Sequence, residues 1–287
     1  MKPLRTGKLR IERLVVPFAK LPQHLHGLKI VQLSDIHFAN DQLSPRLLAQ
    51  AIAAANRNDP DIIVLTGDFI HKEPEPIDKL VPYLRQLQAR HGIYAILGNH
   101  DNYTPQARTY VTRALSRIGI CVLWNRVVYP AGDGLALVGL ADIWSGEFDP
   151  APVFRDLDPN VPRIVLSHNP DTAETLKRWR CDLILSGHTH GGQLVIPGLG
   201  PLPKYLGFFR WLIPNFLHPY LPLLDKECEY ITRHWEWASG MFRLGRNRMY
   251  VNRGLGSHFP GRIFCPPEVT ELVAIAQPNA PKHGFDV

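Results

Sequence analysis

Cysteine is scarce in this chain of 287 residues, which contains only four. No two of them form a Cys-x-x-Cys pair, so the sequence contains no thiolate zinc motif. Four scattered cysteines also do not make the disulfide framework of a small secreted domain. We therefore expect reduced and mostly buried thiols at Cys121, Cys181, Cys228 and Cys265.

A long uninterrupted apolar run is also missing. Charged residues between positions 10 and 20 break up the N-terminal region, and no twin-arginine pair is present, so we expect no export signal. The most apolar stretch is 194–224, where six prolines together with Lys204 and Arg210 exclude a membrane-spanning helix. The sequence predicts a cytoplasmic protein with an irregular apolar insertion at 194–240, and contact with the cytoplasmic face of the inner membrane stays open.

Excess charge is absent from most of the chain. The formal net charge is +6, and residues 1–30 alone hold seven basic residues and one acidic residue, so the remainder is balanced. A surface that binds nucleic acid throughout is therefore disfavoured, and we expect no nucleic-acid partner. The basic segment 1–30, together with 194–224, could contact an anionic membrane surface, or it could be a solvated edge of the fold.

Short apolar runs recur along the chain, and each ends abruptly in small and polar residues. They cover 29–33, 61–65, 92–97, 135–140, 163–166 and 182–185, with further strands expected at 249–252 and 269–276. Helical stretches at 45–56, 77–90, 105–118 and 171–179 lie between them. Ser44 before Pro45 is a typical helix start. This alternation predicts βαβ units and an α/β fold, in which ligands bind beyond the carboxyl ends of the strands.

Carboxylate, amide and imidazole side chains gather where these runs end. A lone histidine is more often structural than a ligand, but the collective placement is unusual. Divalent cations take imidazole nitrogen and carboxylate or amide oxygen, and one aspartate can bridge two ions through its two oxygens. The sequence therefore predicts a metal site built from Asp35, His37, Asp68, Asn99, His168, His188 and His190.

The order of these motifs resembles the calcineurin-like metallophosphoesterases. Five blocks carry the resemblance: Asp35-Ile36-His37, Gly67-Asp68, Gly98-Asn99-His100-Asp101, Ser167-His168 and Gly187-His188-Thr189-His190. The segments 28–35, 191–193 and 252–256 are similar to the bacterial YkuE-like phosphodiesterase branch, which is related to UDP-diacylglucosamine pyrophosphatases. The resemblance covers roughly residues 10–276.

The resemblance implies a four-layer α-β-β-α sandwich of two mixed sheets, with a dinuclear metal site at the C-terminal ends of the strands. Residues 1–28 would be a basic N-terminal arm and first strand, 29–276 the phosphoesterase domain and 277–287 a C-terminal tail.

The resemblance also implies two divalent metal ions as cofactors. One would be held by Asp35, His37, Asp68 and His190, and the other by Asp68, Asn99, His168 and His188. Asp68 would bridge, and a hydroxide between the ions would be the nucleophile. Such ligands accept Mn, Fe, Zn, Co or Ni, so the sequence does not select the metal, and manganese is one of the five.

The same resemblance gives His100 and Asp101 catalytic roles. His100 would meet the phosphate and protonate the leaving oxygen, and the adjacent Asp101 would orient its ring, with a turn or helix-cap role as the alternative. His71 replaces the second acid that the family often has three residues after Asp68. The side chain of His71 could supply that acid's hydrogen bond, or it could face solvent. We favour the solvent-facing position. Arg253 could bind substrate phosphate or form a structural ion pair.

The metal ligands and nucleophile specify phosphoester hydrolysis, whereas the leaving group depends on the surrounding loops. The apolar insertion favours a phosphodiester or pyrophosphate bond in a lipid-linked or nucleotide-sugar substrate such as UDP-diacylglucosamine. A lid packed on its own core and a dimer contact are alternatives for this segment. The alternative functions are a nuclease or cyclic-nucleotide-type phosphodiesterase, which would want a basic groove with stacking aromatics, and a non-catalytic scaffold of the same fold.

Overall fold

The computed structural model describes residues 6–39, 42–213 and 231–277. Lys2, Arg5, Cys228 and nearly all of the expected C-terminal tail lie outside these ranges. Within them, no helix is both long enough and apolar enough to cross a bilayer.

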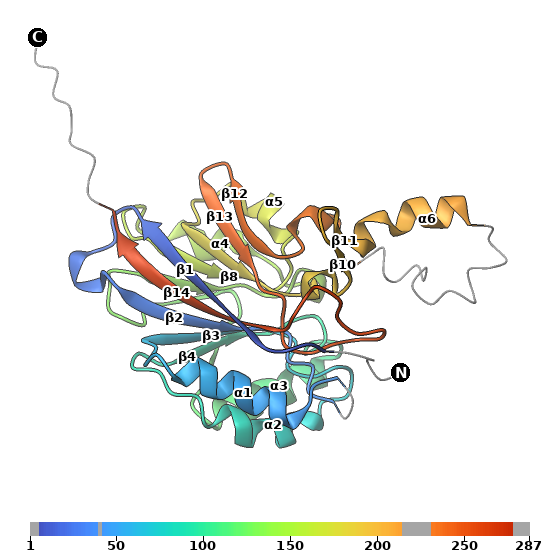
Figure 1. Ribbon diagram of the computed structural model, residues 1–287. Coiled ribbons are helices and arrows are strands. Elements are labelled where there is room, and N and C mark those ends of the chain that lie inside the picture. Colours follow the sequence, from blue (N-terminus) through green and yellow to red (C-terminus); the bar gives the residue numbers. More distant parts are fainter. Residues whose placement is uncertain (1–5, 40–41, 214–230, 278–287) are drawn as a thin grey trace, which may run out of the picture.

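Two mixed sheets of six strands each form the centre of the molecule (Figure 1). The first has the order β1-β14-β2-β3-β4-β5, and only its β14–β2 pair is antiparallel. The second has the order β12-β13-β9-β8-β7-β6, with antiparallel pairs at its two edges. The strands of the first sheet are β1 (Arg10–Phe18), β2 (Leu28–Leu33), β3 (Ile62–Thr66), β4 (Ile93–Ile96), β5 (Cys121–Val122) and β14 (Glu268–Ala276). Those of the second are β6 (Arg126–Val128), β7 (Ala136–Gly139), β8 (Arg163–Leu166), β9 (Leu183–Ser186), β12 (Gly240–Leu244) and β13 (Asn247–Val251).

Helices cover the outer face of each sheet. The first sheet carries α1 (Pro45–Asn56), α2 (Pro76–Leu84) and α3 (Pro105–Ser116), and the second carries α4 (Pro150–Arg155) and α5 (Thr172–Leu176). Helix α1 begins as expected, because the hydroxyl of Ser44 accepts a hydrogen bond of 3.2 Å from the backbone N–H of Leu47. Helix α2 ends earlier than the sequence predicts. The side chain of Asn56 binds the carbonyl of Gln86 and the N–H of Gln88, which a longer helix would need for itself.

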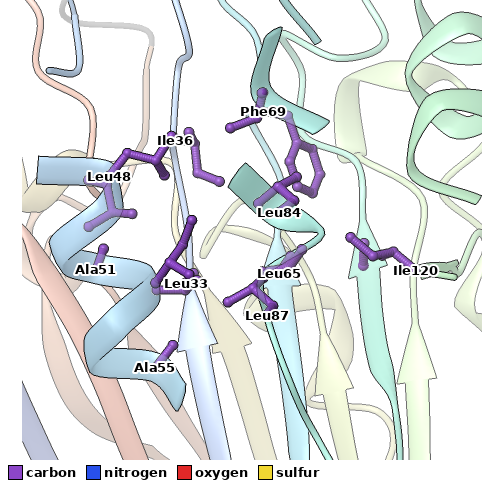
Figure 2. Close-up of a cluster of buried hydrophobic side chains, with 14 of the residues drawn as sticks. Leu33, Ile36, Leu48, Ala51, Ala55, Leu65, Phe69, Leu84, Leu87 and Ile120 are labelled. Atoms are coloured by element: carbon purple, nitrogen blue, oxygen red, sulfur yellow. The ribbon is translucent and has the colours of Figure 1, made fainter. Parts of the chain in front are cut away.

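Three buried clusters account for the four layers. In β2 and β3, Ile30 and Val64 face the second sheet, whereas Leu33 and Leu65 face the helices. Figure 2 shows Leu33 and Leu65 beside residues of α1 and α2. A fully buried leucine contributes about 1.5–3 kcal/mol through the area that it removes from water. Because both faces are covered, these strands are apolar throughout, and the expected four-layer α/β sandwich is confirmed.

The N-terminal segment forms an edge strand of the first sheet. β1 runs parallel to β14, from the pair Arg10 and Glu268 to the pair Phe18 and Ala276. Its arginines contact acids, since Arg13 lies 2.9 Å from Glu271. Residues 10–18 of the basic segment are therefore part of a partly solvated sheet edge, where such exposed pairs contribute little to stability.

The described part of the apolar insertion consists of short elements. After β9 come a 3₁₀ turn (His190–Gly192), the hairpin β10 (Val195–Ile196) and β11 (Gly200–Pro201), and helix α6 (Leu206–Leu212). Leu206 is buried, whereas Trp211 and Leu212 are 79% and 60% exposed. Figure 1 shows α6 projecting from the body of the molecule. The insertion thus has an apolar side against the protein and a second apolar side in solvent.

Candidate metal centre

The predicted site residues lie in the loops that leave the C-terminal ends of five strands. Asp35 and His37 follow β2, Asp68 follows β3, and Asn99 and His100 follow β4, all in the first sheet. In the second sheet, His168 follows β8, while His188 and His190 follow β9. The carboxyl ends of the two sheets therefore meet at one place, as the α/β pattern predicts.

The backbone is strained after three of these strands, β2, β3 and β9. Five site residues have positive φ angles, an uncommon conformation for side chains other than glycine. They are Asp35 (49°), His37 (43°), Asp68 (55°), His188 (70°) and His190 (51°). Each such residue costs about 1–3 kcal/mol, and strain of this kind persists where the surrounding structure fixes a functional geometry.

Two glycines permit the close approach of the two sheets. A Cβ atom on Gly98 would lie against the carboxylate of Asp68 and 2.7 Å from the ring of His168. A Cβ atom on Gly187 would lie against the side chains of Ser34 and Asp35. Glycine is therefore required by space at Gly98 and Gly187, the first residues of the third and fifth motif blocks.

One group of ligand atoms surrounds the side chain of His37. Its Nε2 lies 3.0 Å from Nε2 of His190 and 3.4 Å from Oδ2 of Asp68. The carboxylate of Asp35 lies 3.7 Å from Nε2 of His190. These four residues lie in the segments that follow β2, β3 and β9, and all are buried.

A second group surrounds the side chain of His168. Its Nε2 lies 3.2 Å from each of three atoms: Oδ2 of Asp68, Nδ1 of His188 and Oδ1 of Asn99. Both groups use the same oxygen of Asp68. Atoms that coordinate one cation at about 2.1 Å are separated by about 3.0–3.4 Å in octahedral or tetrahedral geometry. The two groups therefore fit two divalent cations that share Asp68.

The bridging geometry differs from the sequence-based expectation in one respect. We expected Asp68 to use both carboxylate oxygens, one for each ion. Instead, Oδ2 is the oxygen that lies close to both His37 and His168, while Oδ1 accepts a hydrogen bond of 3.0 Å from the backbone N–H of His100.

The imidazole rings are held so that one nitrogen of each faces the centre. Nδ1 of His168 bonds the carbonyl of Thr66 at 2.7 Å, so its Nε2 faces the site. Nδ1 of His190 lies 3.2 Å from the carbonyl of Gly256 and 3.3 Å from the guanidinium of Arg262, and its Nε2 faces His37. His188 is reversed, since its Nε2 bonds the carbonyl of Ile231 at 2.8 Å and its Nδ1 faces His168. Such contacts fix the orientation of a ligating histidine.

Burial keeps most of these rings neutral. It lowers the pKa of His37 to about 4 and, with help from the charge on His168, the pKa of His188 to about 3. Burial and the neighbouring His258 hold the pKa of His190 well below its usual value. Neutral imidazoles offer the lone pairs that cations need.

His168 and Asp68 behave differently. Burial acts to lower the pKa of His168, but the Asp68 carboxylate overrides it and raises that pKa to about 10. Burial likewise acts to raise the pKa of Asp68, but the charge of His168 holds it well below its usual range. Without a cation, a proton on His168 thus balances part of the negative charge of the site.

Asp101 is placed differently from the expected orienting role. Its Oδ1 accepts backbone N–H groups of Phe69 at 2.8 Å and Ile70 at 3.2 Å, and its Oδ2 accepts that of Gly98 at 3.0 Å. The carboxylate therefore ties the loop after β3 to the loop after β4. The ring of His100 is instead fixed through Nδ1 by the backbone carbonyl of His71.

His71 and Arg253 also differ from the alternatives that we favoured or kept open. The ring of His71 is half-buried and stacks on His100, with centroids 5.0 Å apart, rather than facing solvent. The guanidinium of Arg253 lies 2.7 Å from Glu12 and 2.8 Å from Glu268. These contacts commit Arg253 to a structural ion-pair network between β1, β14 and the loop after β13, and they do not support a contact with substrate.

A cavity of about 230 Å³ opens above the two ligand groups. Its floor includes Asp68, Asn99 and His100, and no Lys or Arg lines it in the part of the chain that the structure describes. The walls are mostly apolar and come largely from the insertion: Trp144, Leu194, Leu202, Pro203, Leu206, Ile231, Trp235, Phe259 and Pro260. The site therefore combines a cation-binding floor with an apolar wall.

Sequence reasoning missed one polar side chain at this cavity, His258. It belongs to the loop after β13, and its Nε2 lies 3.3 Å from Nε2 of His190. It stands outside the five ordered blocks. The only nearby signal in the sequence is the Gly254-Leu255-Gly256 segment.

Comparison with known proteins agrees with this geometry. Residues 28–192 match the family model of the calcineurin-like phosphoesterases. The UDP-2,3-diacylglucosamine pyrophosphatase LpxG of Chlamydia muridarum is 29% identical over 96% of this chain and 92% of its own length. The phosphodiesterase YaeI of Escherichia coli is 32% identical over 85% of this chain and 81% of its own, and the metallophosphoesterase YkuE of Bacillus subtilis is 30% identical over 87% and 80%. The resemblance read from the sequence motifs is thereby confirmed.

Proposed function

The chain belongs to the calcineurin-like phosphoesterase family, and from that premise we propose that it hydrolyses a phosphodiester or pyrophosphate bond in a lipid-linked or nucleotide-sugar substrate such as UDP-diacylglucosamine. The observation that carries this proposal is the apolar cavity above the ligand groups. A phosphoryl group on the floor would place the rest of the substrate against the apolar wall. An acyl chain gains about 0.8 kcal/mol for each methylene that it buries.

The residues of the floor have separate tasks in this proposal. Asp35, His37, Asp68 and His190 would hold one divalent cation, and Asn99, His168 and His188 would hold the other together with Asp68. Two such cations supply activation of water and polarisation of the phosphoester. Mn, Fe, Zn, Co and Ni all suit these ligands.

His100 would exchange a proton with the leaving oxygen. Its Nδ1 is committed to the carbonyl of His71, so Nε2 is the nitrogen left for the substrate. Its backbone N–H is held by Asp68, which keeps the residue beside the ligand groups. A positioned acid of this kind contributes about 10²–10⁴-fold to the rate.

The exposed apolar side of the insertion supports binding of the chain to a membrane surface. Phe208, Trp211 and Leu212 of α6 are all more than half exposed. Ile263 and Phe264 are also more than half exposed, and the carbonyl of Ile263 accepts a hydrogen bond from the N–H of Val195 at the start of the insertion. Lys204 and Arg210 lie in the same segment and suit an anionic surface. Flotation with anionic vesicles tests this proposal. The native chain should float with the vesicles, whereas the Trp211→Glu variant should not. A native chain that stays in solution would contradict membrane binding.

Two matched substrates test the cavity's role. We expect the manganese-loaded chain to release UMP from UDP-2,3-diacylglucosamine and to leave UDP-N-acetylglucosamine, which lacks the acyl chains, nearly untouched. Leu206→Arg places a charge in the cavity wall and should lower kcat/KM for the diacyl substrate at least tenfold, whereas Leu212→Arg on the same helix should not. Equal cleavage of both substrates would contradict an acyl-binding cavity.

The alternative functions make different demands. A nuclease needs cationic side chains along its groove, and among the described residues that line this cavity there are none. A scaffold would not need the strained backbone that five site residues adopt after β2, β3 and β9. Cleavage of single-stranded DNA at a rate above that of the diacyl substrate would favour the nuclease.

A further inference from the structure

We propose that His258 is an additional protein ligand of the cation held by Asp35, His37, Asp68 and His190. This inference rests on the proposed two-cation site and adds a residue that the five motif blocks do not contain. The distance from Nε2 of His258 to Nε2 of His190 is 3.3 Å, within the about 3.0–3.4 Å expected for two atoms on one cation.

The arrangement of the rings supports the same conclusion. The centroid separations are 4.6 Å for His37–His258, 4.7 Å for His190–His258 and 4.8 Å for His37–His190, so the three rings form a nearly equilateral triangle. Imidazoles that bind one cation at about 2.1 Å and at right angles have centroids about 4.6 Å apart. His168 and His188, which both belong to the second ligand group, have a similar spacing of 5.0 Å.

The loop that carries His258 is built against the other ligands. The backbone N–H of Gly256 donates a hydrogen bond of 2.7 Å to the carbonyl of Asp35. A Cβ atom on Gly254 would lie 2.6 Å from Cβ of Asp35, and one on Gly256 would lie 2.8 Å from the carbonyl oxygen of Ile36. Glycine at these two positions lets the loop approach the end of β2 and deliver His258 to the site.

Two glutamines hold the residue in place. The side-chain oxygen of Gln193 accepts a hydrogen bond of 2.7 Å from the backbone N–H of His258. The side-chain nitrogen of Gln42 lies 3.3 Å from Nδ1 of His258. The side-chain oxygen of Gln42 is buried and has no hydrogen-bond partner among the described residues. A rotation of 180° about the terminal C–C bond exchanges the oxygen and the nitrogen of a side-chain amide. Turned in this way, the oxygen accepts a hydrogen bond from Nδ1–H, and Nε2 of His258 carries the lone pair that a cation needs.

The additional ligand makes the two cation sites unequal. The site at His37 would have three imidazoles, whereas the site at His168 has two imidazoles and an amide oxygen. Imidazole favours Fe, Co, Ni, Cu and Zn over Mg and Ca. We therefore expect the site at His37 to bind Co²⁺ more tightly than the site at His168.

Cobalt binding tests the proposal without relying on turnover. The full chain, stripped with chelator, is titrated with Co²⁺ and followed by calorimetry and visible absorption. The native chain should bind two ions. In His258→Ala and His258→Gln, the affinity of the tighter site should fall at least tenfold, and its absorption bands should shift, because one nitrogen ligand is lost. The exposed His91 supplies the control, since His91→Ala should bind both ions as the native chain does.

Each outcome decides the proposal. Native affinity and an unchanged spectrum in both His258 variants, with a raised KM for bis-p-nitrophenyl phosphate, would overturn it and assign the ring to the substrate phosphate. A native chain that binds no cobalt would contradict this inference and the proposed function together. Loss of the tighter site in the variants of a chain that hydrolyses no phosphoester would support the ligand and contradict the proposed function alone.

Discussion

The carboxylate of Asp68 and the backbone of His100 are joined by a hydrogen bond of 3.0 Å, from the N–H of His100 to Oδ1 of Asp68. The bond couples the residue that both ligand groups share to the residue proposed to protonate the leaving group. The other oxygen, Oδ2 of Asp68, lies 3.4 Å from His37 and 3.2 Å from His168. Removal of the Asp68 side chain therefore disturbs metal binding and the position of His100 together, whereas changes to the His100 side chain preserve the bond.

Asp68→Asn should empty the site of metal. The remaining oxygen of the amide would accept the N–H of His100, so the amide NH₂ group would occupy the place of Oδ2 and face both ligand groups. We expect metal content, measured by mass spectrometry of the purified chain, to fall from two ions to at most one. Asp78→Asn changes an exposed aspartate and is the matched control. Two bound ions in Asp68→Asn would contradict the shared-oxygen geometry.

His100→Ala should separate catalysis from metal binding. The variant keeps the backbone N–H that binds Asp68, so we expect two ions per chain as in the native protein. Turnover of a phosphodiester should fall about 10²–10⁴-fold, the usual contribution of a positioned general acid. A parallel loss of metal would show that the ring is a ligand rather than a proton donor.

Asp101→Asn should lower stability. The carboxylate accepts three backbone N–H groups on its two oxygens, and an amide has only one oxygen to offer. At least one buried N–H would lose its partner, at a cost of about 1–3 kcal/mol. Urea unfolding of the metal-free chain measures this. Unchanged stability with a large loss of turnover would instead restore a catalytic role for Asp101.

Metal affinity should rise with pH. Without a cation, Asp68 raises the pKa of His168 to about 10, so the ring is protonated at neutral pH and must lose that proton before it can bind a metal. While one proton is displaced, the affinity should increase about tenfold for each pH unit, and this increase should level off as the pH rises through 10. Calorimetric titration at pH 7.5 in buffers of different ionisation enthalpy should show about one proton released per chain. Affinity that does not change between pH 6.5 and 8.5 would contradict the paired state of His168 and Asp68.

The sequence predicted the architecture and the convergence of the motif residues for a clear physical reason. A continuous apolar run indicates a central strand that is covered on both faces. The polar residues that follow such parallel strands meet at one end of the sheet. Asp35 and His190 are 155 positions apart in sequence, yet both follow such runs, and their side chains lie 3.7 Å apart. Edge elements such as β5 and β12 were missed because short or half-exposed strands have no continuous apolar run.

Roles that depend on the individual contacts of a side chain could not be predicted from the sequence. Asp101 follows His100 in sequence, but at a turn its side chain points to backbone N–H groups instead of the neighbouring ring. Arg253 forms an ion pair with Glu12, which lies on β1 and is 241 positions away in sequence. His258 reaches the site through a glycine-rich loop that has no periodic pattern, so only the three-dimensional structure brings it to His190.

The measurement that tests the account most directly is the hydrolysis of bis-p-nitrophenyl phosphate by chelator-stripped protein before and after addition of Mn²⁺, with p-nitrophenyl phosphate as the monoester control. The account predicts no cleavage without metal, restored cleavage with two bound ions per chain, and preference for the diester over the monoester. A chain that binds two ions and cleaves neither this diester nor UDP-2,3-diacylglucosamine would contradict it.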